Sequence, residues 1–181
     1  KQVKGIDIRT VGSGNTGATN VKRVLGTKYF ILVTLLDAMK GLLPLLAIKH
    51  LNFFPAFLAN IDIFLIIIAI AAVLGHSKSV FLKFKGGKSV ATGMGVLYGL
   101  SWPVALSAML IWILVVTLSK YVSLGSVTAA CLAPFLMWYY DQSIVFIGFA
   151  VAIAFYITYL HRENIKRLLD GNENKFSLSK K

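Results

Sequence analysis

The chain contains 181 residues, of which 57% are hydrophobic and 14% are charged, whereas soluble domains usually carry about 25% charged residues. This composition excludes an ordinary soluble domain and an intrinsically disordered chain. Nineteen lysines and arginines against seven acidic residues give a formal net charge of +12. The single cysteine, Cys131, lies in an apolar run, so the sequence offers neither a disulfide framework nor a cysteine-based zinc site.

Residues 1–28 form a basic, polar segment with a glycine-rich stretch. Positions 12 to 17 read Gly-Ser-Gly-Asn-Thr-Gly, which fits the dinucleotide fingerprint G-x-G-x-x-G, but that fingerprint requires a preceding strand and a βαβ unit of about 30 residues. An apolar run starts near Tyr29, so we reject a dinucleotide site. The stretch predicts a turn followed by a short helix, which is capped by Asn15 or Thr16 and ended by Gly26.

This turn is a candidate phosphate site. Backbone N–H groups at the start of a helix bind anions, and a guanidinium group suits phosphate because it donates two hydrogen bonds in a fixed geometry. The candidate ligands are Gly12, Ser13, Asn15 and Arg23. A turn followed by an interfacial helix, without any ligand, explains the segment equally well.

Long apolar runs predict membrane spans in the rest of the chain. A bilayer core about 30 Å thick needs roughly 20 apolar residues in a helix. The run Val90–Leu118 is too long for one span, and Pro103 marks a break, because proline is best tolerated in the first turn of a new helix. The expected fold is an all-α, polytopic membrane bundle with six spans: Tyr29–Ile48, Leu58–Gly75, a short Val90–Ser101, a second helix up to Leu118, Tyr121–Tyr140 and Ser143–Leu160.

The distribution of positive charge supports this count. Lysine and arginine concentrate in the cytoplasmic loops of membrane proteins. With six spans, residues 1–28 contain six of these cations, 76–89 contain four, 161–181 contain six and Lys120 adds one, so that 17 of 19 lie on one side. We therefore expect one membrane domain over residues 1–181, with cytoplasmic segments at 1–28, 76–89 and 161–181, two spans within 29–75 and four within 90–160.

Two ionisable residues, Asp37 and Lys40, lie inside the first apolar run. Charges at membrane depth cost several kcal/mol unless they are paired or hydrated, which makes them functional candidates. Their spacing of three residues also allows a structural ion pair on one helix face. Both interpretations stay open, and the two residues are retained as possible support for the site.

The segment 84–92 reads Phe-Lys-Gly-Gly-Lys-Ser-Val-Ala-Thr. It is not a Walker A motif, because Leu82 occupies the position of the first glycine. Gly86, Gly87 and Lys88 nevertheless combine free backbone donors, a helix start and a cation, as inferred for the first segment. Two such segments on one face predict a phosphate site more strongly than one.

His161 and Asn164 follow the last span, three residues apart and therefore on one helix face at the interface. Histidine suits proton transfer near neutral pH, although a helix end without a catalytic role gives the same pattern. Ser126, near the start of the fifth span, either faces this site or makes a helix contact. Metal binding is not predicted, because the three histidines lie far apart and acidic residues are few.

These motifs together resemble the bacterial acyl-phosphate:glycerol-3-phosphate acyltransferases, the PlsY family. The likeness extends from about Ile6 to Leu169, in order and with compatible spacing. It is carried by Gly12–Asn20 with Arg23, Asp37–Gly41, Gly75-His76, Phe84–Lys88 with Val90–Thr92, Tyr121–Ser126 and His161–Ile165.

The resemblance implies a multi-pass enzyme of phospholipid synthesis in the bacterial cytoplasmic (inner) membrane, with its active site facing the cytoplasm. It would transfer a fatty acyl group from acyl phosphate to the 1-hydroxyl of glycerol 3-phosphate, giving lysophosphatidate and phosphate, without metal or cofactor. Membrane lipids surround it, and neither nucleic acid nor a protein partner is expected. The implied site residues are Ser13, Arg23, Gly86, Gly87, Lys88, Ser126, His161 and Asn164. Family members have seven spans, so we expect the first helix to be absent from this chain.

The chemistry agrees with this resemblance. Two phosphate-bearing substrates need two anion sites close to an apolar channel. An acyl phosphate is a mixed anhydride with a good leaving group, so positioning and charge stabilisation suffice without a covalent nucleophile. Whether His161 removes the hydroxyl proton or orients the acceptor stays open.

Two positions depart from the family pattern. Ser89 stands where glycine is usual, and Ser77-Lys78-Ser79 stand where an aromatic residue and a proline are common. The Cβ of Ser89 either hinders the approach of phosphate or carries a hydroxyl that donates to it. As an alternative function we retain a membrane transporter for a phosphorylated small metabolite with Asp37 and Lys40 along its path, although no motif is repeated.

Overall fold

The computed structural model describes residues 5–51 and 60–176, and the regular secondary structure of this part of the chain is entirely helical, without strands. The all-α class is therefore confirmed. The helices in chain order are α1 (Ala18–Leu25), α2 (Thr27–Leu51), α3 (Ile61–Ser77), the short 3-10 helix η1 (Val80–Leu82), α4 (Val90–Leu100), α5 (Trp102–Ser119), α6 (Val122–Tyr139), α7 (Ile144–Leu160) and α8 (Arg162–Leu169).

The helix boundaries largely follow the predicted apolar runs. α4 ends at Leu100 and α5 begins at Trp102 with Pro103 in its first turn, so the predicted break is confirmed. α3 begins at Ile61, where the Asn60 side chain accepts a hydrogen bond from the backbone N–H of Asp62 at 2.7 Å. The predicted start of that span at Leu58 lies outside the described residues.

The predicted number of six spans is not fully confirmed. Within residues 5–51 and 60–176, four helical segments are long and apolar enough to cross a membrane, or five if α7 and α8 count as one span bent by 61°. α4 has only 11 residues and rises about 17 Å, so it does not cross a core of about 30 Å. The predicted Val90–Ser101 helix therefore forms at its expected place in the chain, but its length is only about half of the thickness of the bilayer core.

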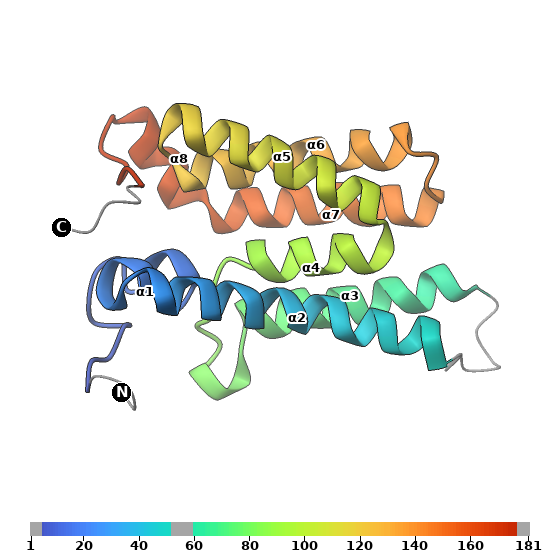
Figure 1. The fold of residues 1–181 in the computed structure, drawn as a ribbon, viewed down its shortest axis with the longest axis horizontal. Helices are drawn as coiled ribbons and strands as arrows, with labels where there is room; N and C mark the ends of the chain where they lie inside the picture. Colours follow the sequence, from blue (N-terminus) through green and yellow to red (C-terminus); the bar gives the residue numbers. More distant parts are fainter. Residues whose placement is uncertain (1–4, 52–59, 177–181) are drawn as a thin grey trace.

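α4 lies between two layers of helices (Figure 1), with α1, α2 and α3 on one side and α5 to α8 on the other. Its glycines allow an unusually close approach to α2. A Cβ on Gly95 would lie 1.9 Å from the carbonyl oxygen of Ala38, and a Cβ on Gly41 would lie 2.2 Å from that of Thr92. Small residues at such contacts are how membrane helices gain close packing without a hydrophobic driving force.

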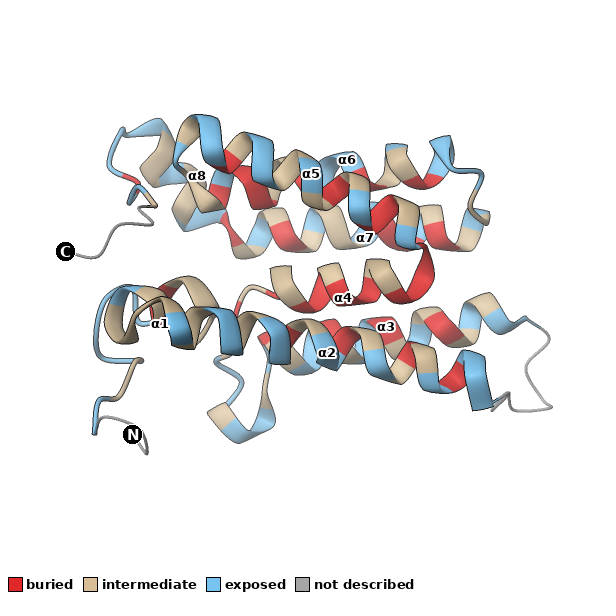
Figure 2. Cartoon of the chain, viewed as in Figure 1, coloured by how far each residue is buried: buried red, intermediate tan, exposed pale blue. Residues whose placement is uncertain are grey.

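Burial is concentrated along α4 and the surfaces that face it, whereas the outer surfaces are exposed (Figure 2). The core includes Leu45, Leu65, Val73, Val96 and Met137. Large apolar side chains cover the outside of the spans, such as Leu35 and Leu114, which are 57% and 58% exposed. Such side chains are stable in contact with lipid, so this distribution is typical of a membrane protein.

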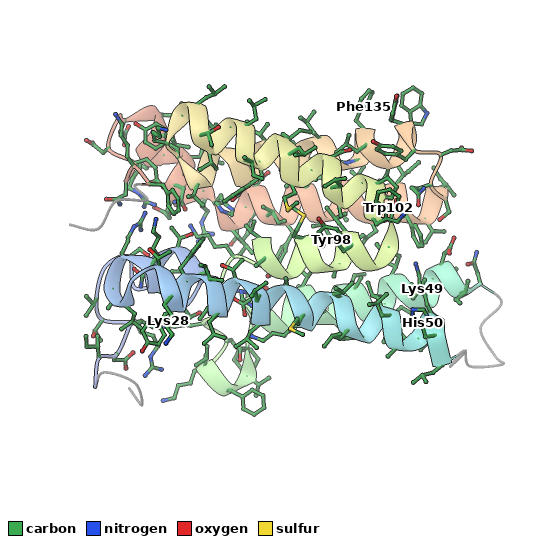
Figure 3. All side chains as sticks on the ribbon, in the orientation of Figure 1. Lys28, Lys49, His50, Tyr98, Trp102 and Phe135 are labelled. Atoms are coloured by element: carbon green, nitrogen blue, oxygen red, sulfur yellow. The ribbon has the colours of Figure 1, made fainter. Side chains whose placement is uncertain are left out.

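The basic segments gather at one end of the bundle. α1, α8 and the ends of the described chain lie there (Figure 1). Lys28 marks the same end of α2, whereas Lys49 and His50 lie at the opposite end (Figure 3). Twenty-one helical residues separate the two lysines, a rise of about 30 Å that equals the thickness of a bilayer core. The side chains with chemistry described below all lie at the Lys28 end.

Candidate active site

Asn20 folds the first glycine-rich segment. This buried side chain donates hydrogen bonds to the carbonyl oxygens of Ile8, Val11 and Asn15 at 2.9, 3.1 and 2.9 Å. Its Oδ1 accepts a hydrogen bond from the backbone N–H of Ser13 at 2.8 Å. One amide thereby closes residues 8–15 into a compact turn in front of α1.

Glycine is required in this turn, and the helix cap differs from the prediction. Gly12 has a φ of +66°, and a Cβ there would lie 2.3 Å from Asn20 Oδ1. The N-cap of α1 is Gly17, not Asn15 or Thr16. Asn15 instead accepts a hydrogen bond from the Gly17 N–H at 2.7 Å. This bond stabilises the turn before the helix, so the helix begins after Gly17 and not after Asn15. Gly26 ends the helix as predicted.

The second glycine segment is bound to the end of α3. The Gly86 N–H donates to the carbonyl oxygen of Ser77 at 3.0 Å, and the Gly87 N–H donates to that of His76 at 3.3 Å. The prediction that these two N–H groups are free anion donors is therefore wrong in this structure. The glycines are needed for packing, since a Cβ on Gly86 would lie 2.0 Å from the His76 carbonyl oxygen.

A polar pocket lies between the two glycine segments. It brings together Ser13 and Asn15 from the first segment and Gly86 from the second. Three cationic side chains also line it: Arg9, Lys83 and Lys85. Its walls do not include Gly12, Arg23, Gly87 or Lys88. The pocket thus combines cations and small polar groups, which suits an anionic ligand.

Lys88 belongs to a second group, which a buried carboxylate organises. Its ammonium group donates a hydrogen bond to Oδ1 of Asn164, and Nδ2 of Asn164 donates to Glu173 Oε1 at 2.6 Å. Glu173 also accepts from Arg167 Nε at 2.7 Å and from Ser123 Oγ at 2.9 Å. α6, α8 and the start of α4 therefore meet at one network.

The charges around Lys88 change its pKa. Burial lowers the pKa of its ammonium group to about 8, and the positive charges of Arg167, Arg23 and Arg162 add to this effect, whereas Glu173 opposes it. Arg23 is exposed on α1 and lies outside the polar pocket, but it is close enough for its charge to act on Lys88. An added anion would relieve the repulsion among these cations, so the group is electrostatically prepared for phosphate.

His161 is buried where α7 ends and α8 begins. Its Nδ1 lies 2.8 Å from the carbonyl oxygen of Ile157, which fixes the tautomer that carries the proton on Nδ1. Burial lowers the pKa of the ring to about 4, and the charge of Lys88 adds to this shift. His161 is therefore neutral at physiological pH and keeps its Nε2 lone pair available as an acceptor.

Ser126 lines an apolar pocket between α4, α5, α6 and α7. Its hydroxyl donates to the carbonyl oxygen of Val122 at 2.8 Å and accepts from Trp112 Nε1 at 3.2 Å. Both interpretations of Ser126 therefore have support, since it makes a contact between helices and faces a cavity. Ile157 lines the same cavity, which connects this wall to the His161 ring through the Ile157 carbonyl group.

Asp37 forms an ion pair with Lys40, with 2.7 Å between Asp37 Oδ1 and Lys40 Nζ. The same carboxylate oxygen lies 3.5 Å from His76 Nδ1. On the other side of the imidazole, a Cβ on Gly87 would lie 2.2 Å from His76 Nε2. The Asp37–Lys40 pair therefore lies behind the second glycine segment, where it supports that segment. The transporter alternative needs Asp37 to line an open path, but the carboxylate of Asp37 is bound to its partners instead.

The two departures from the family pattern have clear structural positions. Ser89 is buried at the N-cap of α4 with a φ of +57°, and its hydroxyl donates to the Val73 carbonyl oxygen at 2.8 Å. It therefore points toward α3, and neither effect expected on phosphate is seen. Ser77 is also buried, and its hydroxyl lies 2.8 Å from that of Tyr156 on α7.

The segment after α8 closes the site. The Phe176 N–H donates to the Lys120 carbonyl oxygen at 2.7 Å. Its ring lies 6.0 Å from that of Phe30 on α2, and Lys22 Nζ of α1 lies 3.5 Å from its centroid. This contact joins the two helix layers at the end that holds the site.

The comparisons with known proteins agree with this geometry. A family model described as glycerol-3-phosphate acyltransferase matches residues 1–171. The chain belongs to this acyltransferase family. A relative from Geotalea daltonii described as glycerol-3-phosphate acyltransferase is 45% identical over 172 residues, which are 95% of this chain and 85% of the relative.

Two solved structures support the same fold for this acyltransferase chain. The crystal structure of PlsY, an integral membrane glycerol 3-phosphate acyltransferase, in its glycerol 3-phosphate form matches with a TM-score of 0.88 and 44% identity, over 97% of this chain and 85% of that chain. The lysophosphatidic acid form matches with a TM-score of 0.83 and 43% identity, over 92% and 82%. The family and the integral membrane fold predicted from the motifs are confirmed.

Sequence reasoning did not single out several residues that build the site of this acyltransferase. Asn20, His76 and Glu173 were not assigned roles, and each acts through contacts with distant segments. The only feature of the sequence that could have indicated a role for Glu173 was its negative charge within a basic C-terminal segment. No group of three or more histidine, cysteine or acidic residues suited to a metal occurs in the part of the chain that the structure describes.

Proposed function

We propose that this acyltransferase moves a fatty acyl group from acyl phosphate to the 1-hydroxyl of glycerol 3-phosphate, giving lysophosphatidate and inorganic phosphate in phospholipid synthesis. The observation that carries the proposal is the position of the polar, cationic pocket and the Lys88 network at the same end of the bundle, near an apolar cavity. A reaction between two phosphate compounds, one of them a lipid, needs this combination of sites.

The two groups of cations divide the anions between them in this proposal. Arg9, Ser13 and Asn15 hold one phosphate in the polar pocket, and Gly86 forms part of its wall. Lys88, Arg23 and Asn164 hold the other, because an anion relieves the repulsion from the arginines, which adds to burial in lowering the pKa of Lys88. Gly12 and Gly87 contribute through shape, since each allows a neighbour to approach closely. Asp37 and Lys40 support the second glycine segment from behind.

The acyl chain occupies the apolar pocket in this proposal. Small-molecule sites usually have mostly apolar walls with a few polar groups, and the walls of this pocket have that composition. Ser126 and Trp112 supply the polar groups in its wall. Surrounding membrane lipids give the acyl phosphate a direct route from the bilayer.

The proposed chemistry is direct transfer. The 1-hydroxyl oxygen of glycerol 3-phosphate bonds to the acyl carbon, the bond from that carbon to the phosphate oxygen breaks, and the hydroxyl proton leaves with phosphate. Before transfer, His161 orients the hydroxyl by accepting its hydrogen bond at Nε2. Because a group with a pKa of about 4 is a weak base, the proton does not stay on the ring and passes to the departing phosphate as the bond to the acyl carbon breaks. The cations stabilise charge on the departing phosphate, and no covalent nucleophile is needed.

The proposed location is the bacterial cytoplasmic membrane, with the site at its cytoplasmic face. This orientation is supported by the charge distribution, because the end that carries α1 and α8 also carries most of the lysines and arginines. Glycerol 3-phosphate would then reach the polar pocket from the cytoplasm, and the acyl donor would reach it from the inner leaflet.

The direct test uses purified protein in phospholipid nanodiscs with palmitoyl phosphate. Inorganic phosphate and palmitoyl-glycerol phosphate should appear in equal amounts, and only when glycerol 3-phosphate is present. Lys88→Ala should reduce the rate, whereas Lys28→Ala, which changes an exposed lysine that lines neither pocket, should not. Phosphate release without acyl-glycerol phosphate, or no reaction at all, would reject the proposal.

A further inference from the structure

A compact turn connects α3 to the second glycine segment. Four backbone hydrogen bonds close it between residues 79 and 85, including Phe84 N–H to the Ser79 carbonyl oxygen at 2.8 Å and Lys85 N–H to that of Leu82 at 3.1 Å. Lys83 and Phe84 have φ values of +53° and +61°. A bulky side chain at positive φ is uncommon, so the shape of this turn, which we call the 79–85 turn, is specifically maintained.

The outer face of the 79–85 turn carries exposed apolar side chains. Phe81 is 97% exposed, which is the highest value among the large exposed apolar side chains of the described chain. Val80 and Phe84 beside it are 71% and 62% exposed. Three exposed lysines accompany them: Lys78, Lys83 and Lys85. A fully exposed phenylalanine is unfavourable in water, so this face needs a cover.

The position of the turn indicates what covers it. In Figure 1 the turn projects sideways from the bundle, beside the first part of α2 and close to the end where α1 and the chain ends lie. Lys28 lies at the start of α2, at the cytoplasmic end of the bundle (Figure 3). The exposed side chains Ile31, Leu32 and Leu35 of α2 follow it. The turn therefore lies where a lipid headgroup layer meets the acyl chains.

We propose that the 79–85 turn is an interfacial anchor that inserts into the cytoplasmic leaflet, with Val80, Phe81 and Phe84 at the boundary of headgroups and acyl chains and with the three lysines on anionic headgroups. Aromatic and basic side chains favour this level of a membrane, and lysines near the surface are attracted by anionic lipids. The partner is thus the anionic lipid surface itself.

The anchor also acts on the polar pocket. Leu82, Lys83, Lys85 and Gly86 of the same segment form one wall of that pocket. Insertion of the outer face therefore holds this wall at headgroup level, where an acyl donor presents its phosphate. This consequence rests on the proposed function, whereas insertion of the turn does not.

The test measures depth and not activity, so its outcome is separate from that of the acyl-transfer assay. In a Cys131→Ala background, a nitroxide spin label is placed by Phe81→Cys in nanodiscs that contain phosphatidylglycerol. Matched labels at Val11→Cys, in the first glycine segment, and at Leu110→Cys, in the middle of α5, give the water and hydrocarbon references. Accessibility to molecular oxygen and to a water-soluble nickel chelate is compared.

The accessibility of the label at position 81 to the nickel chelate should be at least fivefold lower than that of the label at position 11. Its accessibility to oxygen should be higher than that of the label at 11 and lower than that of the label at 110. Equal nickel accessibility at 81 and 11 would overturn the anchor. If Phe81→Cys does not fold, Val80→Cys gives the same measurement. In nanodiscs of phosphatidylcholine alone the label should lie closer to water, and an unchanged depth would overturn the role of the lysines.

Discussion

Ser123 and Glu173 are 50 residues apart in the chain, yet Ser123 Oγ donates a hydrogen bond to Glu173 Oε1 at 2.9 Å. The same carboxylate accepts hydrogen bonds from Arg167 and Asn164 of α8. Asn164 in turn accepts a hydrogen bond from the ammonium group of Lys88. A single buried acid therefore connects the second glycine segment, α6 and α8. Removal of this carboxylate would therefore take the partner of all three donors at once.

Glu173→Ala should destabilise the protein and reduce activity strongly. Leaving buried donors without a partner costs about 1–3 kcal/mol each, although such costs do not add up fully. Thermal unfolding in detergent should show a clear fall in Tm. Asp170→Asn, which changes an exposed acid in the same segment, serves as the control and should leave the free energy of unfolding within about 0.5 kcal/mol of the parent.

Glu173 also predicts lower stability in acid. Burial raises the pKa of its carboxyl group, but the hydrogen bonds from Asn164, Arg167 and Ser123 outweigh this and hold the pKa below its ordinary value. A depressed carboxyl pKa contributes stability above the unfolded pKa of about 4.3, and this contribution is lost as the pH falls through the folded pKa. The loss of stability between pH 5 and pH 3 should therefore be smaller in Glu173→Gln than in the parent protein.

Lys88 predicts a loss of substrate affinity in alkali. With a pKa of about 8, its ammonium group is charged at pH 7 and largely neutral at pH 9. The KM for glycerol 3-phosphate or for the acyl donor should therefore rise between these values. Lys88→Arg stays charged throughout, so the rise should disappear in that variant, as measured by initial rates from pH 6.5 to 9.5. A rise of the same size in Lys88→Arg would assign it to another group.

His161 predicts a flat pH dependence in the range where histidine usually titrates. Because its pKa is about 4, the ring stays neutral from pH 5.5 to 7.5, and kcat should show no inflection near 6.5. His161→Ala should lower kcat by roughly 10²-fold, with a smaller change in KM. An inflection near 6.5 that vanishes in His161→Ala would show that the ring is charged in part of this range.

Ser89 offers a test of backbone strain at the departure from the family pattern. Its φ of +57° costs about 1–2 kcal/mol relative to glycine, and its hydrogen bond to Val73 returns about 1 kcal/mol. Ser89→Gly should therefore change stability little, whereas Ser89→Ala should be less stable than either by about 1 kcal/mol. Thermal unfolding of the three proteins checks this order, and Ser89→Ala as stable as Ser89→Gly would contradict it.

His76 and Gly87 offer a test of packing behind the second glycine segment. A Cβ on Gly87 would lie 2.2 Å from His76 Nε2, so Gly87→Ala should displace the segment and raise the KM of a phosphate substrate. His76→Ala removes the obstructing ring. The double variant should therefore recover part of the affinity, which steady-state kinetics of the four proteins would reveal as a coupling. Purely additive effects would show that the contact does not position the segment.

The sequence determined the class of the protein because a helix that spans a membrane requires a long run of apolar residues, which is visible in the composition. Apolar runs of span length, the one-sided charge distribution and the break at Pro103 each depend on neighbouring residues only. They were sufficient for an all-helical bundle with its polar chemistry at one end. The motifs with Ser13, Lys88 and His161 were also readable, because each is a short local pattern.

Only the tertiary structure decided how these motifs are used. The Gly86 and Gly87 N–H groups donate to the end of α3, Ser89 points at Val73, and α4 is too short to cross the bilayer core. Glu173 connects segments from across the chain, with Ser123 as its most distant partner in sequence. Such contacts depend on which helices pack together, and packing arises from steric fit between distant residues, so no local pattern records it.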